Sequence, residues 1–208
     1  MSTIPSTPSI AALILAAGKG KRFGSDKRLA TLNHSPNSLL QQSLNLPLSL
    51  QIPTAVVLRP EDQQQLAKLL GAHLSNPLLS PIYSSKSEQG MAYSLAAGIH
   101  QLLTQNYDGV LILLGDMPWI KPSTLNELIQ HYQPGKIIVP TYQSSSEKVR
   151  SGHPVFFTRY WFKQLEKLEG DEGAKKLLNA NTQDIILVDV NDRGILRDVD
   201  QPNDLTSE

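Results

Sequence analysis

A cluster of glycines and cations near the N-terminus carries the strongest sign of chemistry. Residues 18–27 hold three glycines and four Lys or Arg side chains, directly after an apolar run at residues 10–16. Glycines allow positive φ values and close backbone approach, and successive N–H groups in such a loop form an anion-binding concavity. Arg22 and Lys27 add the charge that would neutralise a chain of phosphates. The pattern predicts a phosphate-binding loop, with an ordinary strand-to-helix connection as the alternative.

The spacing of this loop separates it from two well-known phosphate motifs. Its glycines read G-x-G-x-x-x-G, whereas the dinucleotide fingerprint requires G-x-G-x-x-G. A Walker A loop needs Ser or Thr after Gly-Lys, but Gly20-Lys21 is followed by Arg22. Neither motif fits.

Aspartates at two places later in the chain predict a metal-binding site. Asp116 follows the apolar run at residues 109–114, which is typical of a buried parallel strand. Ligands bind outside the carboxyl ends of such strands, and Mg²⁺ bridges carboxylate and phosphate oxygens. Asp198 and Asp200 are two apart, so they face the same side of an extended segment. The alternatives are a helix cap for Asp116 and a surface turn for the second pair.

The elements that position these residues alternate along the chain. This alternation predicts βαβ units and an α/β fold, a single three-layer αβα domain with a central, mostly parallel sheet. Residues 1–9 are rich in Ser, Thr and Pro and are expected to be a disordered lead-in to one domain at 10–208. Strands are expected at 10–16, 54–58, 79–83, 109–114, 136–139, 155–158 and 184–190, and helices at 38–46, 61–70, 91–103, 123–131, 160–168 and 173–179.

Composition narrows the function classes. The 208 residues carry 19 Lys or Arg and 19 Asp or Glu, so the basic excess of a general nucleic-acid binder is missing. The absence of Cys excludes disulfides, thiolate metal sites and cysteine nucleophiles. The longest strongly apolar run, residues 10–17, is far shorter than the ~20 residues that span a bilayer. No Lys or Arg precedes it, unlike in a signal peptide. We therefore expect a cytoplasmic protein without membrane or nucleic-acid partners.

Six motifs in order resemble those of one enzyme family. The loop at residues 15–27 reads L-A-A-G-x-G-x-R-F-G-x-x-K, which resembles the signature of GT-A-like nucleotidyltransferases, and among them the molybdenum cofactor cytidylyltransferases. The further motifs are G-M-x-x-S-L-x-x-G at 90–98, L-G-D-M-P at 114–118, G-H-P-V at 152–155, G-D-x-G-A at 170–174 and D-V-D-x-P-x-D at 198–204. The resemblance covers residues 13–205, nearly the whole chain.

The resemblance implies an activity and a set of site residues. It implies a Rossmann-like nucleotidyltransferase that moves a nucleoside monophosphate from a nucleoside triphosphate to a phosphate-bearing acceptor, with Mg²⁺ as cofactor and release of pyrophosphate. The leading acceptor is a molybdopterin-type cofactor, and a molybdoenzyme would receive the product. The implied catalytic residues are Arg22, Lys27 and Asp116, and the implied metal ligands are Asp116 and Asp200. The implied acceptor contacts are His153 and Asp171. The implied nucleotide contacts are Leu15, Ala16, Ala17, Gly18, Gly20, Arg22, Gly24, Lys27 and Ser94.

Several alternatives stay open for single residues. Ser94 lies beside an apolar stripe of Leu95, Ile99 and Leu102, so it is either a nucleotide contact or a polar neighbour of the core. His153 either donates a hydrogen bond to the acceptor or is a buried, satisfied histidine. Asp171 is either an acceptor contact or the N-cap of the following helix.

The donor and the acceptor also have alternatives. The guanylyl-transferring branch of the family usually carries Ala-Gly-Gly where this chain has Ala16-Ala17-Gly18, and the extra methyl of Ala17 crowds a purine. CTP is therefore favoured over GTP, although a methyl supplies only ~1–3 kcal/mol of discrimination. The rival functions are a nucleotidyltransferase of the same fold acting on a sugar phosphate or alcohol phosphate, and a non-catalytic cofactor-binding chaperone.

Overall fold

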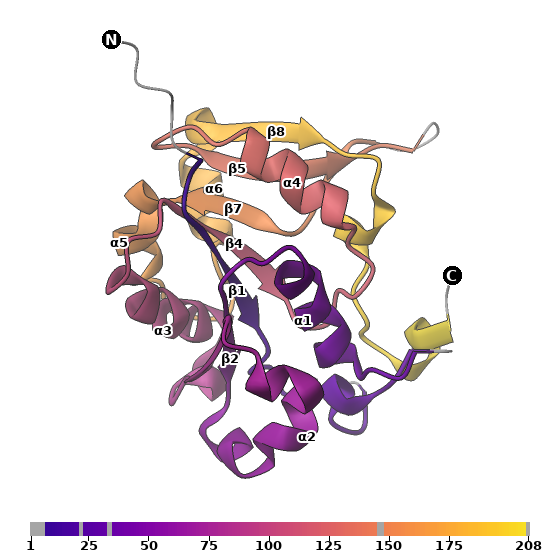
Figure 1. The fold of residues 1–208 in the computed structure, drawn as a ribbon. Helices are drawn as coiled ribbons and strands as arrows, with labels where there is room; N and C mark the ends of the chain where they lie inside the picture. The colour runs from indigo at the N-terminus through magenta and orange to yellow at the C-terminus, as the bar shows by residue number, and fades with distance from the viewer. Residues whose placement is uncertain (1–6, 21–22, 33–34, 145–147, 207–208) are drawn as a thin grey trace.

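A single sheet lies between two layers of helices in the computed structural model (Figure 1). The structure describes residues 7–20, 23–32, 35–144 and 148–206. The strand order is β3-β2-β1-β4-β7-β5-β6, and β8 also pairs with β5. The strands are β1 (Ile10–Leu15), β2 (Thr54–Leu58), β3 (Leu79–Tyr83), β4 (Gly109–Leu114), β5 (Ile137–Tyr142), β6 (Arg150–Ser151), β7 (Val155–Thr158) and β8 (Ile185–Asp189).

The sheet is mostly parallel, which confirms the predicted fold class. β1 pairs in parallel with both β2 and β4. β2 also pairs in parallel with β3, and β5 pairs in parallel with β8. β7 is the exception at the centre, because it runs antiparallel between β4 and β5. The short β6, which is not among the strands expected from the sequence, pairs antiparallel with β5.

The helices agree less closely with the sequence pattern than the strands do. The predicted helix at 61–70 is a 3₁₀ segment, Pro60–Gln65, followed by a short α-helix, and the one at 160–168 divides in the same way. Both windings bring residues three apart together, so the apolar spacing cannot distinguish them. The α-helices are α1 (Leu39–Ser49), α2 (Leu66–Leu70), α3 (Met91–Leu103), α4 (Pro122–Gln130), α5 (Phe162–Leu165) and α6 (Lys175–Ala180).

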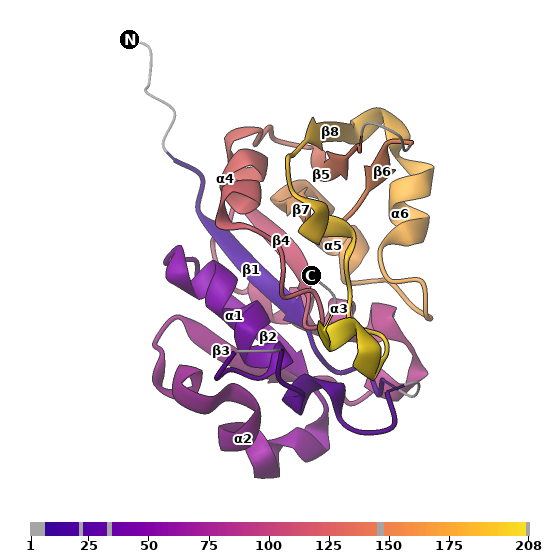
Figure 2. The same ribbon diagram turned by 90° about the vertical axis from the view of Figure 1, so that its right-hand side faces the viewer.

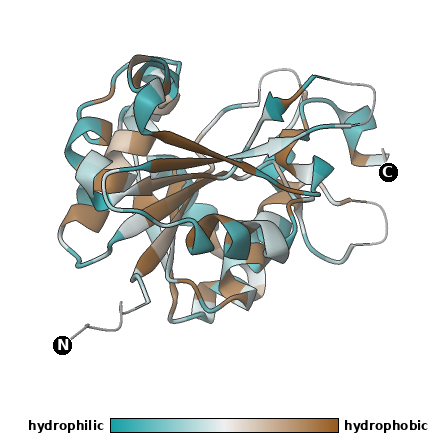
Figure 3. Ribbon diagram, turned by 90° about the horizontal axis from the view of Figure 1, so that it is seen from above, coloured by the Kyte–Doolittle hydropathy of each residue, from teal (hydrophilic) through white to brown (hydrophobic). Residues whose placement is uncertain are grey.

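Alternate residues of the central strands supply two separate cores. Ala12 and Ile14 of β1 pack with residues of α1, α2 and α4, whereas Ala11 and Leu13 pack with residues of α3 and α5. Successive strand residues point to opposite faces, so a strand covered on both sides must be apolar throughout. Figure 3 shows these strands as a brown layer between helices that carry many teal residues. No helix in the described ranges is long and apolar enough to cross a membrane.

The topology brings three distant segments to one edge of the sheet. Leu15 and Leu114 are register partners, so β1 and β4 end side by side. The segment after β8 returns to the same edge, where the Val199 N–H donates to the Asp116 carbonyl over 2.9 Å. Figure 2 shows this yellow C-terminal segment descending from β8. The loop after β1, the residues after β4 and the C-terminal acids can therefore form one site.

Candidate active site

A cavity of about 330 Å³ opens at the carboxyl ends of β1 and β4. The structure brings most of the predicted nucleotide and metal residues together around it. Asp198, whose participation the sequence leaves open, also lines the cavity. The lining residues are Leu15, Ala16, Ala17, Gly18, Gly20, Lys27, Arg28, Ser87, Met91, Ser94, Leu114, Gly115, Asp116, Asp198 and Asp200.

Two predicted loop residues are not found in this lining. Arg22 lies outside the described residues. Gly24 is exposed, has a φ of 77° and does not line the cavity. Its positive φ indicates that it serves the turn of the loop rather than the cavity wall.

Gly20 shapes the loop for a steric and a conformational reason. Its φ is +53°, a backbone conformation that L side chains rarely adopt, and a Cβ there would lie 3.2 Å from Cγ of Lys27. The loop backbone thus packs directly on the Lys27 stem. This packing helps to hold the ammonium at the cavity.

Lys27 lies between carboxylates from two other segments. Its Nζ donates to Oδ2 of Asp116 over 2.6 Å and to the Val199 carbonyl over 3.0 Å, and it lies 3.7 Å from Oδ1 of Asp200. Lys27 begins a 3₁₀ turn, Lys27–Leu29, whose N-cap is Asp26. A single ammonium therefore links the glycine loop, the end of β4 and the C-terminal segment.

The negative charge around Lys27 exceeds what one ammonium balances. Oδ1 of Asp116 is buried and has no hydrogen-bond partner among the described residues. Asp198 is exposed, yet desolvation of its carboxyl and the neighbouring carboxylates of Asp116 and Asp200 raise its pKa. Such an arrangement favours a further cation.

The donor set suits a cation that also takes ligands from its substrate. In the described part of the chain, no group of three or more His, Asp or Glu side chains is placed to hold a metal ion. Mg²⁺ is commonly bound by one or two carboxylates together with substrate phosphates. The carboxylates of Asp116 and Asp200, both at the cavity, fit that mode.

A second cavity of about 350 Å³ adjoins the first, and the two share Leu15, Met91 and Leu114. Its wall is mainly apolar and includes His153. Burial lowers the pKa of His153, and the ring makes a hydrogen bond with the Ile112 backbone. The buried Nδ1 has no hydrogen-bond partner among the described residues. Nδ1 is thus buried and unsatisfied, although the residue as a whole is half-buried. In the neutral form the ring donates its one N–H to the Ile112 backbone, so Nδ1 can only accept a hydrogen bond, whereas the sequence predicts His153 as a donor to the acceptor.

Of the two alternatives for Asp171, the N-cap role is wrong. α6 begins at Lys175, its N-cap is Ala174, and no side chain caps it. The loop instead packs on the start of α3, where the Ala92 N–H donates to the Gly170 carbonyl over 3.0 Å. Asp171 lies close to Gly90 there and lines neither cavity.

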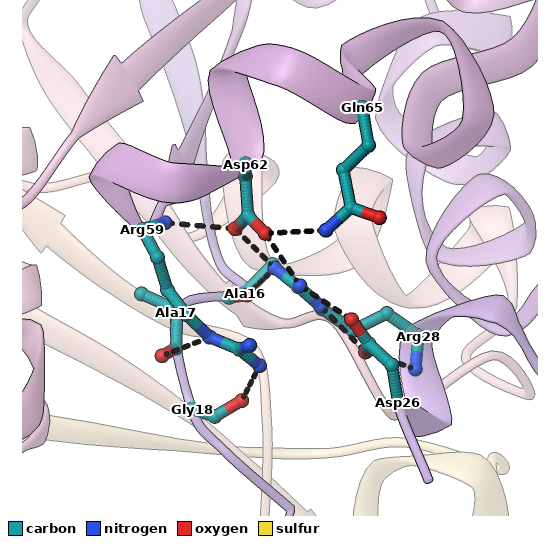
Figure 4. A network of polar contacts seen from close by, with 8 residues as sticks. All are labelled: Ala16, Ala17, Gly18, Asp26, Arg28, Arg59, Asp62 and Gln65. Carbon is teal, nitrogen blue, oxygen red and sulfur yellow. Dashed lines mark hydrogen bonds and ion pairs between the residues drawn. The ribbon is translucent and has the colours of Figure 1, made fainter.

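A buried ionic network lies behind the glycine loop and is not predicted by the sequence pattern. Arg28, only 3% exposed, pairs with Asp62 and Asp26, and Arg59 donates to carbonyls of the loop (Figure 4). The sequence pattern assigns Asp62 only to the start of a helix. The available signal was the position of Arg59 directly after β2, at the same sheet edge as the glycine loop.

Comparison with known families shows which family the chain belongs to. The family model described as "MobA-like NTP transferase domain" matches residues 12–185. The chain belongs to this family. It is therefore an enzyme of the NTP transferase family, whose common activity is nucleotidyl transfer.

Relatives of the MobA-like chain carry varied names. "Purine catabolism protein PucB" of Bacillus subtilis is 27% identical over 95% of each chain. "Nicotine blue oxidoreductase" of Paenarthrobacter nicotinovorans is 26% identical over 93% of each chain. The crystal structure of Rv0371c from Mycobacterium tuberculosis shares the fold, with a TM-score of 0.76 and 23% identity over 96% of each chain. A structure of that protein in complex with manganese has a TM-score of 0.66, with 22% identity over 89% of each chain.

Proposed function

We propose that this MobA-like enzyme transfers a nucleoside monophosphate from a nucleoside triphosphate to a phosphate-bearing acceptor and releases pyrophosphate. CTP is the favoured donor, and a molybdopterin-type cofactor is the leading acceptor. The nucleotide-modified cofactor would then pass to a molybdoenzyme. The observation that carries the proposal is the cavity in which a glycine loop faces Lys27 and three aspartates.

On the nucleotide side, the loop backbone and Lys27 hold the triphosphate. Lys27 reaches the cavity and balances the charge that develops on the leaving pyrophosphate. Arg22 is assigned the same task from the sequence motif alone. Ser94 and Ala17 both line the cavity, which supports their proposed contact with the nucleotide.

Asp116 and Asp200 are the residues that would hold Mg²⁺. The buried, unpartnered Oδ1 of Asp116 and the crowding of carboxylates support this assignment. When bound, the ion would polarise the α-phosphate. The manganese complex of Rv0371c supports a divalent ion at this fold, although it does not select Mg²⁺.

The reaction needs positioning more than covalent help from the protein. An oxygen of the acceptor phosphate forms a bond to the α-phosphorus. At the same time, the bond breaks between the α-phosphorus and the oxygen that bridges it to the β-phosphorus. The electron pair of the broken bond leaves with pyrophosphate. No general base is required, because the acceptor phosphate is already ionised, and the loop and Lys27 supply orientation and charge balance.

The second cavity is the proposed site of the acceptor's organic part. Its apolar wall suits a flat ring, and the neutral Nδ1 of His153 would accept a hydrogen bond from a ring N–H. Asp171 lies outside this lining. Its contact with the acceptor is proposed only for a ligand that extends beyond the cavity toward Gly90.

A pyrophosphate-release assay tests the proposal. Each of the four common nucleoside triphosphates is combined with Mg²⁺ and one acceptor at a time: molybdopterin-type cofactor, a sugar phosphate or an alcohol phosphate. We expect release that requires both CTP and the pterin acceptor. Release with a sugar or alcohol phosphate instead would replace the acceptor assignment. Binding without release, or redox turnover without a nucleotide, would overturn the transferase proposal.

A further inference from the structure

We propose that Arg59 and the buried Arg28–Asp62 pair are positioning residues that turn the backbone amides of the glycine loop toward the triphosphate. This inference rests on the proposed function. It assigns a task to three residues that touch neither nucleotide nor metal in that proposal. Arg59 and Asp62 do not line the nucleotide cavity, whereas Arg28 does, and the proposed role of all three is exerted through the main chain of the loop.

Three consecutive carbonyls of the loop are held by arginines from other segments. Nη1 of Arg28 donates to the Ala16 carbonyl over 3.0 Å. Arg59 donates from Nε to the Ala17 carbonyl over 3.2 Å and from Nη2 to the Gly18 carbonyl over 2.7 Å. Figure 4 shows both carbonyls of this second pair turned toward the Arg59 guanidinium.

The orientation of these carbonyls fixes the amides. A trans peptide is planar, so each C=O points opposite to the N–H of the next residue. The N–H groups of Ala17, Gly18 and Lys19 must therefore point away from the arginines. None of the three donates a backbone hydrogen bond within the described ranges. Consecutive N–H groups facing one way are what an anion-binding concavity requires.

The arginines are themselves held in place by Asp62. This carboxylate is fully buried, receives Arg28 at 2.5 and 2.8 Å, and accepts the backbone N–H of Arg59 at 2.9 Å. Asp26 binds the other side of the Arg28 guanidinium at 2.6 and 2.8 Å. A network so fully paired restricts its members to one geometry. The 3₁₀ segment Pro60–Gln65 is thereby fixed to the loop across the sheet edge.

The chain contains a matched control for Arg59. Nη1 of Arg159 also donates to two backbone carbonyls, those of Gln105 at 2.7 Å and Tyr107 at 3.0 Å. Those carbonyls follow α3 and lie away from the cavity lining. Arg159→Ala therefore removes the same kind of contact without touching the glycine loop.

The first test measures binding of inorganic triphosphate by titration calorimetry, well below the melting temperature. Two lost hydrogen bonds from a charged donor should weaken binding of triphosphate to Arg59→Ala by about tenfold or more. Arg159→Ala should stay within about twofold of wild type. Equal affinities for wild type and Arg59→Ala, or no binding of triphosphate to wild type, would overturn the inference.

A second variant separates the positioning role from direct electrostatics. Asp62→Asn removes a negative charge near the loop, so simple Coulomb attraction predicts tighter binding of the anion. Loss of the positioning network predicts weaker binding. Hydrogen exchange across the chain verifies that the variant is folded at the assay temperature. Tighter binding of triphosphate to folded Asp62→Asn would contradict the inference.

Kinetics distinguishes failure of this inference from failure of the proposed function. If wild type releases pyrophosphate but Arg59→Ala keeps its KM for the nucleotide, the positioning role is wrong and the transferase function stands. If triphosphate binding follows the prediction but no nucleotide is turned over, the positioning role stands and the function is wrong.

Discussion

The two oxygens of Asp116 have different surroundings. Oδ2 accepts a hydrogen bond from Lys27 at 2.6 Å, while Oδ1 is buried and has no hydrogen-bond partner among the described residues. A buried carboxylate oxygen without a partner is costly unless a ligand supplies one. This asymmetry is why the metal assignment begins at Asp116 rather than at the more exposed Asp200.

Removing the Asp116 carboxylate should abolish catalysis and leave the fold intact. We expect Asp116→Ala to lower the rate of Mg²⁺-dependent pyrophosphate release by about 100-fold or more, because charge stabilisation at the α-phosphate is lost. Asp189→Ala changes an exposed carboxylate on β8 and should keep the wild-type rate. Full activity of folded Asp116→Ala would end the metal assignment.

Lys27 makes a second prediction that requires no substrate. Without its ammonium, Asp116, Asp198 and Asp200 repel one another with no counter-charge from this residue. Mg²⁺ alone should then raise the melting temperature of Lys27→Ala more than that of wild type. Lys136→Ala, which loses a 2.9 Å pair with Asp184 outside the cavity, should respond to Mg²⁺ as wild type does. Equal shifts in all three proteins would show that the carboxylates do not hold the ion.

At the scale of elements, the start of α3 joins the two cavities. Met91, the first residue of the helix, lines both of them. Gly90 precedes it with a φ of +139°, and a Cβ there would lie 2.2 Å from the Gly170 carbonyl oxygen. Only glycine allows this close approach between α3 and the loop before α6.

Gly90→Ala should therefore destabilise the protein more than strain at φ alone explains. The backbone of Gly90, with a φ of 139° and a ψ of 164°, lies in a region that is essentially restricted to glycine and costs about 1–3 kcal/mol for a residue with a Cβ, and the clash adds about 1–3 kcal/mol. Gly135→Ala is the matched control, because Gly135 has a φ of +82° and no atom lies within 4 Å of the point that a Cβ would occupy. Urea unfolding measures both variants. Equal losses of unfolding free energy would show that the contact with the Gly170 carbonyl does not constrain the fold.

The network that ties the 3₁₀ segment Pro60–Gln65 to the glycine loop predicts a dependence of stability on pH. Burial by itself raises the pKa of Asp26 and Asp62, but the hydrogen bonds and charge of Arg28 outweigh it and lower both. A carboxyl whose folded pKa lies below its unfolded pKa stabilises the protein above the unfolded value, about 4 for Asp, and this stability is lost as the pH falls through the folded pKa.

Asp62→Asn tests this linkage. We expect the variant to lose about 3–5 kcal/mol at pH 7, because Arg28 is left incompletely paired in a buried site. Its stability should also fall less steeply than that of wild type below about pH 4, since one of the linked carboxyls is gone. Denaturant unfolding from pH 7 to pH 3 gives both curves. Parallel curves would contradict the pKa direction assigned to Asp62.

At the scale of the whole molecule, local pattern predicted the strands and the edge at which the site lies. The apolar residues of β1 are buried on both faces of the sheet, in alternation. Asp116 follows β4 at the same sheet edge where the glycine loop follows β1. Such features are encoded within a few neighbouring residues. The antiparallel direction of β7 is not, because a short apolar strand has the same composition in either direction.

The missed parts of the candidate site depend on contacts across long sequence separations. Arg28 and Asp62 are 34 positions apart, and neither residue type predicts burial without its partner. The direct pairing of Lys27 with Asp116 joins residues 89 positions apart. The sequence pattern predicts both at the site but assigns them to different ligands. Only the fold shows that Lys27 and Asp116 contact each other.

A crystal structure of the protein with Mg²⁺ and a non-hydrolysable CTP analogue tests the central claim most directly. We predict a triphosphate bound by the amides that follow β1, and Mg²⁺ between Asp116 and the α-phosphate. The claim is contradicted if the nucleotide binds elsewhere, or if it occupies this cavity while Asp116 contacts only Lys27 and no metal ion.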